Sequence, residues 1–128
     1  MTGNSILLIE DEPEVAGFLV DFFRLDGWEV DPVANGLEAL ERLRENHYDV
    51  IVSDLLMPEL DGTSLYLEVS RRYPELLPRF IFISGFEDTE IAAFIKQTQA
   101  PILSKPFRFE EIRKAISDVL GNTPTARA

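Results

Sequence analysis

Residues 6–13 have the sequence ILLIEDEP, in which four apolar residues are followed by three acids and a proline. A short continuous apolar run is typical of a β-strand that is covered on both faces, as in a parallel sheet. Pro13 suits the first turn of an α-helix, where its missing N–H is not needed. Apolar residues then recur at helical spacing as far as Phe23, and Gly27 ends the stretch. This segment therefore predicts a strand followed by a helix.

The same alternation of a short apolar run and an amphipathic stretch continues to residue 121. Further strands are expected at 28–33, 50–52, 80–83 and 102–103, and further helices at 37–43, 60–73, 89–99 and 109–119. Five such units with short connections predict an α/β fold with a parallel sheet between two helical layers. With right-handed crossovers, this count allows a flavodoxin-like (βα)5 sandwich with strand order 2-1-3-4-5. Residues 122–128 are small and polar and are expected to form a flexible tail, which leaves one domain over 1–121.

The composition disfavours several classes of protein. The 128 residues are 45% hydrophobic and include 23 acidic and 12 basic side chains, for a net charge of −11. Direct nucleic-acid binding needs a basic surface and is disfavoured. No apolar run approaches the roughly 20 residues that span a bilayer, and residues 1–5 do not resemble a signal peptide. No cysteine is present for a disulfide or a thiolate metal site. A cytoplasmic protein with no membrane partner is expected.

Acidic residues follow two of the predicted strands. In open α/β sheets, ligands bind beyond the carboxyl ends of the strands where the strand order reverses, here between the first and third strands. The first strand is followed by Glu10, Asp11 and Glu12, and the third leads to Asp54. Carboxylates in one crevice repel each other unless a cation compensates, and a hard divalent ion with few protein ligands is best matched by Mg²⁺. The sequence therefore predicts a magnesium site at this edge.

Two further strand ends would complete a site for phosphoryl transfer. Ser84 follows the fourth strand and Lys105 follows the fifth. Asp54 can act as the nucleophile, Lys105 and Mg²⁺ can neutralise the phosphoryl oxygens, and Ser84 can donate a hydrogen bond to one of them. The formal charges of the site balance when Mg²⁺ is bound. The charge that a phosphoryl group adds would then draw Ser84 and Lys105 inward.

Five motifs around these residues resemble the landmarks of response-regulator receiver domains. They are IEDEP at 9–13, VSDLLMP at 52–58, DG at 61–62, ISG at 83–85 and KPF at 105–107. The resemblance covers about residues 6–120, and five motifs in this order and spacing are specific. It implies that Asp54 is the phosphoacceptor and that Ser84 and Lys105 bind the phosphoryl group.

The same resemblance implies a set of metal ligands. Asp11 and Asp54 would bind Mg²⁺, for which Mn²⁺ is a substitute. Glu10 would reach the ion directly or through water, and the backbone carbonyl of Leu56 would complete the set. Glu10 stands where Asp is commoner in the family. Ile102 stands where many receivers carry an aromatic ring that rotates on activation, so the resemblance does not extend to that part of the switch.

The resemblance also implies a signalling role rather than a conventional turnover enzyme. A histidine kinase or a histidine-phosphotransfer protein would supply the phosphoryl group, and slow self-dephosphorylation would remove it. Phosphorylation would shift a pre-existing conformational equilibrium and so control a downstream protein. A phosphorylation-dependent homodimer is consistent with this role. The chain would be a stand-alone receiver or a part of a larger or hybrid protein.

Three other functions compete with this interpretation. Residues 59–63, ELDGT, resemble the loop of haloacid-dehalogenase-type phosphatases, but the first Asp is missing and the fragment follows Pro58 rather than a strand. A binding module that uses the same shape without phosphorylation is disfavoured by the complete set of site residues. A flavin carrier is disfavoured because no Ser/Thr/Gly-rich phosphate loop follows the first strand.

The pattern of the first helix also predicts which of its residues are buried. Phe18, Phe22 and Phe23 share an apolar stripe and are expected in the core. Val20 and Leu25 lie off that stripe and are expected on the surface, either singly or in a face that binds a partner.

Overall fold

A computed structural model describes residues 4–55, 62–84, 93, 97–98 and 100–122 of the chain. The strands are β1 (Ser5–Ile9), β2 (Glu29–Val33), β3 (Val50–Asp54), β4 (Phe80–Ser84) and β5 (Ile102–Ser104). The helices are α1 (Pro13–Leu25), α2 (Gly36–Glu45), α3 (Gly62–Arg72), the short 3₁₀ helix η1 (Pro74–Arg79) and α5 (Phe109–Asn122). Most of the helix expected at 89–99 and the tail after residue 122 lie outside the described residues.

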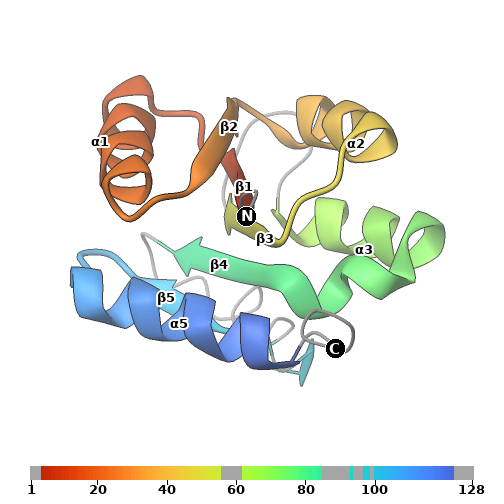
Figure 1. Cartoon of the computed structure of the whole chain (residues 1–128). Coiled ribbons are helices and arrows are strands. Elements are labelled where there is room, and N and C mark those ends of the chain that lie inside the picture. The colour runs from red at the N-terminus through yellow and green to blue at the C-terminus, as the bar shows by residue number, and fades with distance from the viewer. Residues whose placement is uncertain (1–3, 56–61, 85–92, 94–96, 99, 123–128) are drawn as a thin grey trace.

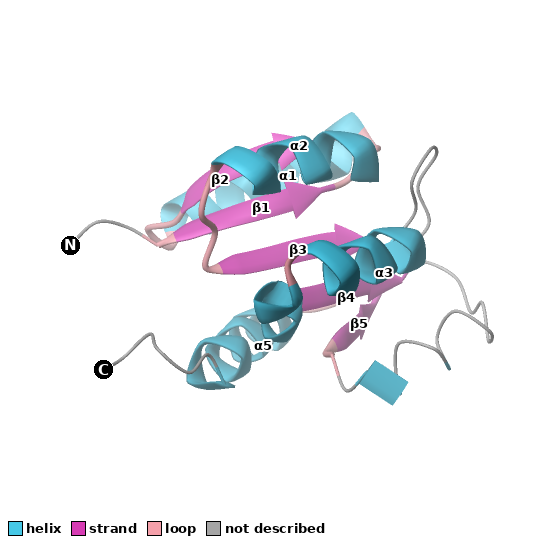
Figure 2. Cartoon of the chain, turned by 90° about the vertical axis from the view of Figure 1, so that its right-hand side faces the viewer, coloured by secondary structure: helices cyan, strands magenta, loops and turns pink. Residues whose placement is uncertain are grey.

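The five strands form one parallel sheet with the order β2-β1-β3-β4-β5, which confirms the predicted order. The strands run in the same direction, so their carboxyl ends lie together at one end of the sheet (Figure 2). In the register of the sheet, Ile9 lies beside Ser53, and Asp54 lies beside Ile83. The residues that follow β1 therefore lie beside the end of β3, where the strand order reverses.

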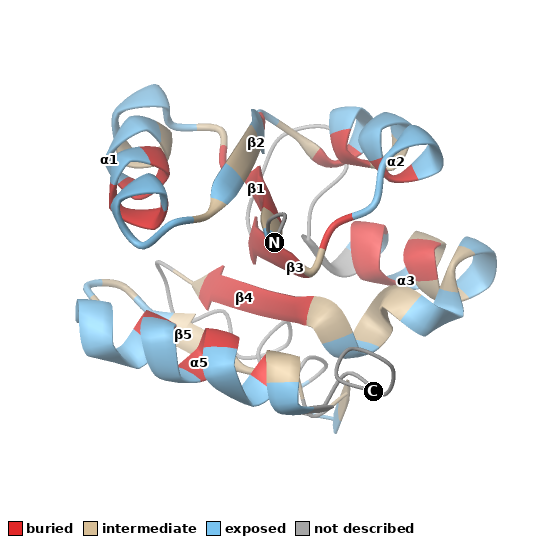
Figure 3. Ribbon diagram, in the orientation of Figure 1, coloured by how far each residue is buried: buried red, intermediate tan, exposed pale blue. Residues whose placement is uncertain are grey.

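Helices cover both faces of the sheet. Helices α1 and α5 lie on one face, and α2 and α3 lie on the other (Figure 1). Alternate residues of β1 enter the two resulting cores: Ile6 and Leu8 pack on the α1 and α5 side, and Leu7 and Ile9 pack on the α2 and α3 side. The central strands are buried and the outer helix faces are exposed (Figure 3). The continuous apolar runs of the sequence thus mark strands that are covered on both faces.

Local sequence explains where two helices begin. Pro13 is the first residue of α1, as predicted. Asn35 caps α2, because its side chain accepts a hydrogen bond of 2.9 Å from the backbone N–H of Glu38. The 3₁₀ helix η1, which contains Pro78, has no counterpart among the predicted elements.

Two predictions for α1 are wrong. Phe18 is 60% exposed rather than buried, and Val20 is 8% exposed rather than on the surface. Phe22 and Phe23 are buried and Leu25 is exposed, as predicted. At about 100° per residue, Val20 lies about 60° from Phe23 around the helix axis, whereas Phe18 lies about 140° away. The buried face of α1 is therefore turned toward Val20, and Phe18 is left at its rim.

The two outermost strands of the sheet, β2 and β5, differ in length and chemistry. Among the strands in the described residues, β2 pairs with β1 alone, and Pro32 of β2 lies beside Leu8 of β1. Strand β5, at the other edge, has three residues. None of the helices in the described ranges combines the length and the apolar character needed to cross a bilayer.

Candidate functional site

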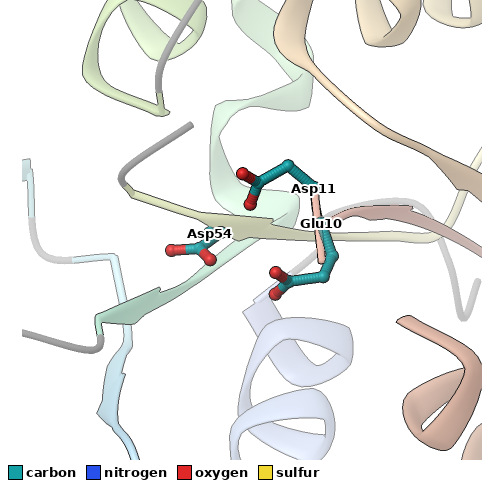
Figure 4. A group of neighbouring side chains, drawn as sticks. All are labelled: Glu10, Asp11 and Asp54. Carbon is teal, nitrogen blue, oxygen red and sulfur yellow. The ribbon is translucent and has the colours of Figure 1, made fainter. Parts of the chain in front are cut away.

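Three carboxylates meet at the carboxyl ends of β1 and β3 (Figure 4). Glu10 and Asp11 directly follow β1, and Asp54 is the last residue of β3. One oxygen of each side chain lies within 4.8 Å of the corresponding oxygens of the other two. Glu10 and Asp54 are only 3% and 6% exposed, and Asp11 is half-buried. Three hard oxygen ligands converge at this point, which is the arrangement that a small divalent cation requires.

The backbone around these side chains is fixed by the sheet. The Glu10 N–H donates to the carbonyl of Val33 at 3.0 Å, which extends the β1–β2 pairing by one residue. The Glu10 carboxylate accepts a hydrogen bond of 3.2 Å from the N–H of Glu12, at the start of α1. Beyond Asp54, the N–H of Leu55 donates to the carbonyl of Ile83 at 2.9 Å. The hydrogen bonds of the sheet thus fix the backbone that carries the carboxylates of Glu10 and Asp54.

Lys105 supplies a positive charge beside two of these carboxylates. It follows β5, and its backbone N–H donates to the carbonyl of Ser84 at 2.9 Å. Its Nζ lies 3.4 Å from Oδ2 of Asp54 and 3.7 Å from Oε1 of Glu10. The peptide bond between Lys105 and Pro106 is cis. One ammonium group therefore bridges two buried carboxylates.

The electrostatics of the site show an excess of negative charge. Burial, followed by the charge of Asp54, raises the pKa of Glu10 to about 7. Burial alone would lower the pKa of Lys105, but the charges of Asp54 and Glu10 outweigh this effect and raise it. Oε1 of Glu10 is buried and accepts no hydrogen bond from any residue that the structure describes. A buried oxygen without a donor, in a site with three carboxylates and one ammonium, fits a bound cation.

The structure brings most of the predicted site residues to one edge of the sheet. One ion could contact the carboxylates of Glu10, Asp11 and Asp54 together. The Lys105 ammonium group lies beside Glu10 and Asp54. Ser84 ends β4, one residue beyond the partner of Asp54 in the register, so it lies at the same edge. Leu56, the predicted carbonyl ligand, lies outside the described residues. The hydrogen bond from the N–H of Glu12 to Glu10 was not predicted, because the sequence shows Glu12 only as an acid at a helix start.

The sequence pattern of the response regulator receiver domain matches residues 6–117. This chain belongs to the response regulator receiver family. It is therefore a receiver domain of two-component signal transduction, as the motifs predicted. The haloacid-dehalogenase and flavin-carrier interpretations are not supported.

Two curated proteins and one solved structure illustrate the similarity of this receiver domain to known ones. The response regulator receiver protein CpdR of Brucella abortus strain 2308 is 35% identical, over 90% of this chain and 95% of that protein. The sensor kinase CckA of the same organism is 33% identical over 91% of this chain, which spans only 12% of the length of CckA. A receiver domain protein from Clostridium thermocellum has a TM-score of 0.83 and 26% identity, with 92% of this chain and 94% of that chain covered.

Proposed function

We propose that this receiver domain, residues 1–121, accepts a phosphoryl group on Asp54 in a Mg²⁺-dependent reaction and then changes conformation to control a partner protein. The single observation that carries the proposal is the position of Asp54, whose buried carboxylate lies beside two other carboxylates and 3.4 Å from the ammonium group of Lys105. This arrangement combines a nucleophile with the charges that neutralise a phosphoryl group.

In the proposed reaction, an Asp54 oxygen attacks the phosphorus atom of a phosphohistidine. The new O–P bond forms as the P–N bond breaks, and the imidazole nitrogen that leaves takes up a proton. Lys105 faces Asp54 from the β5 side and would neutralise one phosphoryl oxygen. Ser84 would donate its hydroxyl hydrogen to another. The added negative charge would draw Ser84 and Lys105 toward Asp54, and this movement would change the surface that a partner reads.

Glu10, Asp11 and Asp54 would hold the magnesium ion, with the Leu56 carbonyl as a further ligand. The ion, when bound, would neutralise charge on the carboxylates and on the phosphoryl oxygens. The buried Oε1 of Glu10, which accepts no hydrogen bond within the described part of the chain, supports this ligand set.

The phosphoryl donor would be a histidine kinase or a histidine-phosphotransfer protein, and the domain would act in the cytoplasm. Similarity to a sensor kinase and to a response regulator receiver protein supports this class of donor. The downstream target would be a protein, or a second copy of the domain after phosphorylation. The domain would catalyse its own modification and its slow reversal, without turnover of a separate substrate.

Incubation with acetyl phosphate or phosphoramidate and Mg²⁺ tests the proposal, with intact mass as the readout. We expect the mass of one phosphoryl group to be added, and we expect EDTA to prevent the addition. A protein whose mass is unchanged after long incubation with saturating donor and Mg²⁺ would contradict the proposal.

The apparent affinity for Mg²⁺ should rise with pH across neutrality. The pKa of Glu10 is raised to about 7 by burial and by Asp54, so this ligand carries a proton below pH 7 in the metal-free protein. Since a ligand must lose its proton to bind, each pH unit below 7 should weaken the apparent affinity by up to about tenfold. Titration calorimetry at pH 6, 7 and 8 measures this trend. An affinity for Mg²⁺ that is equal at pH 6 and pH 8 would show that Glu10 does not take part.

A further inference from the structure

A cluster of side chains joins the middle of α1 to the start of α5. The ring of Phe109 lies 4.1 Å from that of Phe22 and 5.6 Å from that of Phe18, measured between centroids, and both pairs are stacked. Arg113, one turn further along α5, lies 4.9 Å from the ring centroid of Phe22. It also donates two hydrogen bonds, of 2.8 and 3.0 Å, to the carboxylate of Asp26. We call these five residues the α1–α5 clamp.

The clamp lies at one end of the segment that carries Lys105. Residues 105–108 connect β5 to α5, and Phe109 is the first residue of α5. At its β5 end, the segment is held by the hydrogen bond from the Lys105 N–H to Ser84. At its α5 end, the N–H of Arg108 donates to the side chain of Glu111 at 2.7 Å. The position of Lys105 therefore depends on β4 and on the first turn of α5.

A pocket of about 460 Å³ lies between this segment and α1. On the α1 side it is lined by Val15, Phe18 and Leu19, and on the other side by Lys105, Pro106, Phe107 and Phe109. The pocket separates Lys105 and Pro106 from the α1 side chains that line it, so α1 does not pack tightly against Lys105 at this point. Lys105 is held instead by the hydrogen bond to Ser84, by Phe107, which packs against the core on the α1 and α5 side, and by the first turn of α5. The clamp ties that first turn to α1.

We propose that the α1–α5 clamp positions Lys105 over Asp54, so that Phe18 and Phe109 are positioning residues for phosphoryl transfer. This inference rests on the proposed function and goes beyond it, because neither ring touches the reacting atoms. It also gives the exposed ring of Phe18 a role, since that ring stacks on the ring of Phe109.

Loosening the clamp should change the affinity for Mg²⁺ and the rate of phosphoryl transfer in opposite directions. In the intact protein, the Lys105 ammonium group competes with a cation for Asp54 and Glu10, because it lies 3.4 and 3.7 Å from their oxygens. When the clamp is loosened, Lys105 moves away and Mg²⁺ binds more tightly. The phosphoryl group, however, loses the cation that neutralises it, so its transfer becomes slower. A general loosening of the fold would weaken both properties.

The test compares the wild type with Phe109→Ala and Phe18→Ala. Because Phe18 is exposed, its replacement does not threaten the core. At saturating Mg²⁺ and acetyl phosphate, the rate of phosphorylation should fall about tenfold in both variants, within the hundredfold that a 1 Å misplacement can cost. The Kd for Mg²⁺, measured by calorimetry, should decrease. Phe109→Tyr keeps the ring stack, so its phosphorylation rate and its Kd for Mg²⁺ should both equal those of the wild type. Leu25→Ala removes an exposed apolar side chain of α1 outside the clamp and should leave both unchanged.

A second readout needs no phosphorylation. The rate at which an acylating reagent modifies Lys105, relative to the exposed Lys114 in the same protein, should rise in Phe109→Ala and Phe18→Ala. If the wild type takes no phosphoryl group, the proposed function fails, and this ratio still tests the clamp. An unchanged ratio together with an unchanged phosphorylation rate would overturn the inference. So would a defect confined to transfer from a phosphohistidine protein, because the rings would then serve as a docking surface only.

Discussion

Asp54→Asn is expected to abolish phosphorylation by acetyl phosphate, with no gain in mass even after long incubation. A carboxamide has nearly the same shape as a carboxylate, but it is not a nucleophile for phosphorus. The fold should be retained. The substitution removes the neighbouring charge that raises the pKa of Glu10, so the metal-free protein should be no less stable than the wild type near pH 8. Intact mass and thermal unfolding measure the two effects.

Two other variants make this result specific to Asp54. Asp11→Asn removes a carboxylate of the cluster but leaves the nucleophile, so phosphorylation should need more Mg²⁺ without being lost. Asp21→Asn changes an exposed acid on α1 and should behave like the wild type.

Asp61 lies in the fragment that resembles a phosphatase loop. Hydrolysis of a small phosphate ester that is lost in Asp61→Asn but kept in Asp54→Asn would show that the proposed phosphoacceptor is wrong.

Lys105→Met is expected to lower the free energy of unfolding of the metal-free protein by about 2 kcal/mol at pH 8. Removing one partner of a buried ion pair costs roughly 3–5 kcal/mol, and the partial exposure of Lys105 reduces that figure. The substitution leaves Glu10 and Asp54 without their shared countercharge. Urea unfolding with EDTA present measures the loss. Added Mg²⁺ should restore most of the stability, because the ion replaces the missing positive charge.

The sign of the pH dependence follows from Glu10. Its ordinary pKa is 4.5, and in the fold it is raised to about 7 by burial and by Asp54. The folded state therefore holds this proton more tightly than the unfolded state, and the metal-free protein loses stability as the pH rises from about 4.5 to 7. The effect of Lys105→Met should accordingly be smaller at pH 5 than at pH 8.

Lys114→Met is the matched control for this experiment. Lys114 is an exposed lysine of α5 that pairs with Asp118 one turn away. Exposed pairs of this kind contribute about 0–1 kcal/mol, so its removal should change stability little at either pH. Equal losses in Lys105→Met and Lys114→Met would mean that the charge of Lys105 has no special place in the site.

Much of the site could be predicted because strand ends in a parallel sheet are neighbours. Once the apolar runs at 6–9 and 50–52 are recognised as adjacent strands, Glu10 and Asp54 must lie close together. The contact of Lys105 with Asp54 follows from the same logic, although 51 residues separate them.

The aromatic contacts at the rim of α1 could not be predicted in this way. The helical period identifies an apolar stripe, but it does not fix how the helix is rotated against its neighbours, so the predicted positions of Phe18 and Val20 are wrong. The stack of Phe18 and Phe22 on Phe109 depends on that rotation and on a helix that lies far along the chain.

The proline in the edge strand β2 has a consequence for self-association. Pro32 has no N–H, so the open side of β2 lacks a donor that an incoming strand would need. The opposite edge, β5, offers only three residues. Neither outer strand is therefore well suited to pair with a strand of another molecule. Natural proteins commonly protect their edge strands against aggregation in this way. Any dimer of this protein should be held together mainly by side chains on helices, and should separate without breaking a shared ladder of backbone hydrogen bonds.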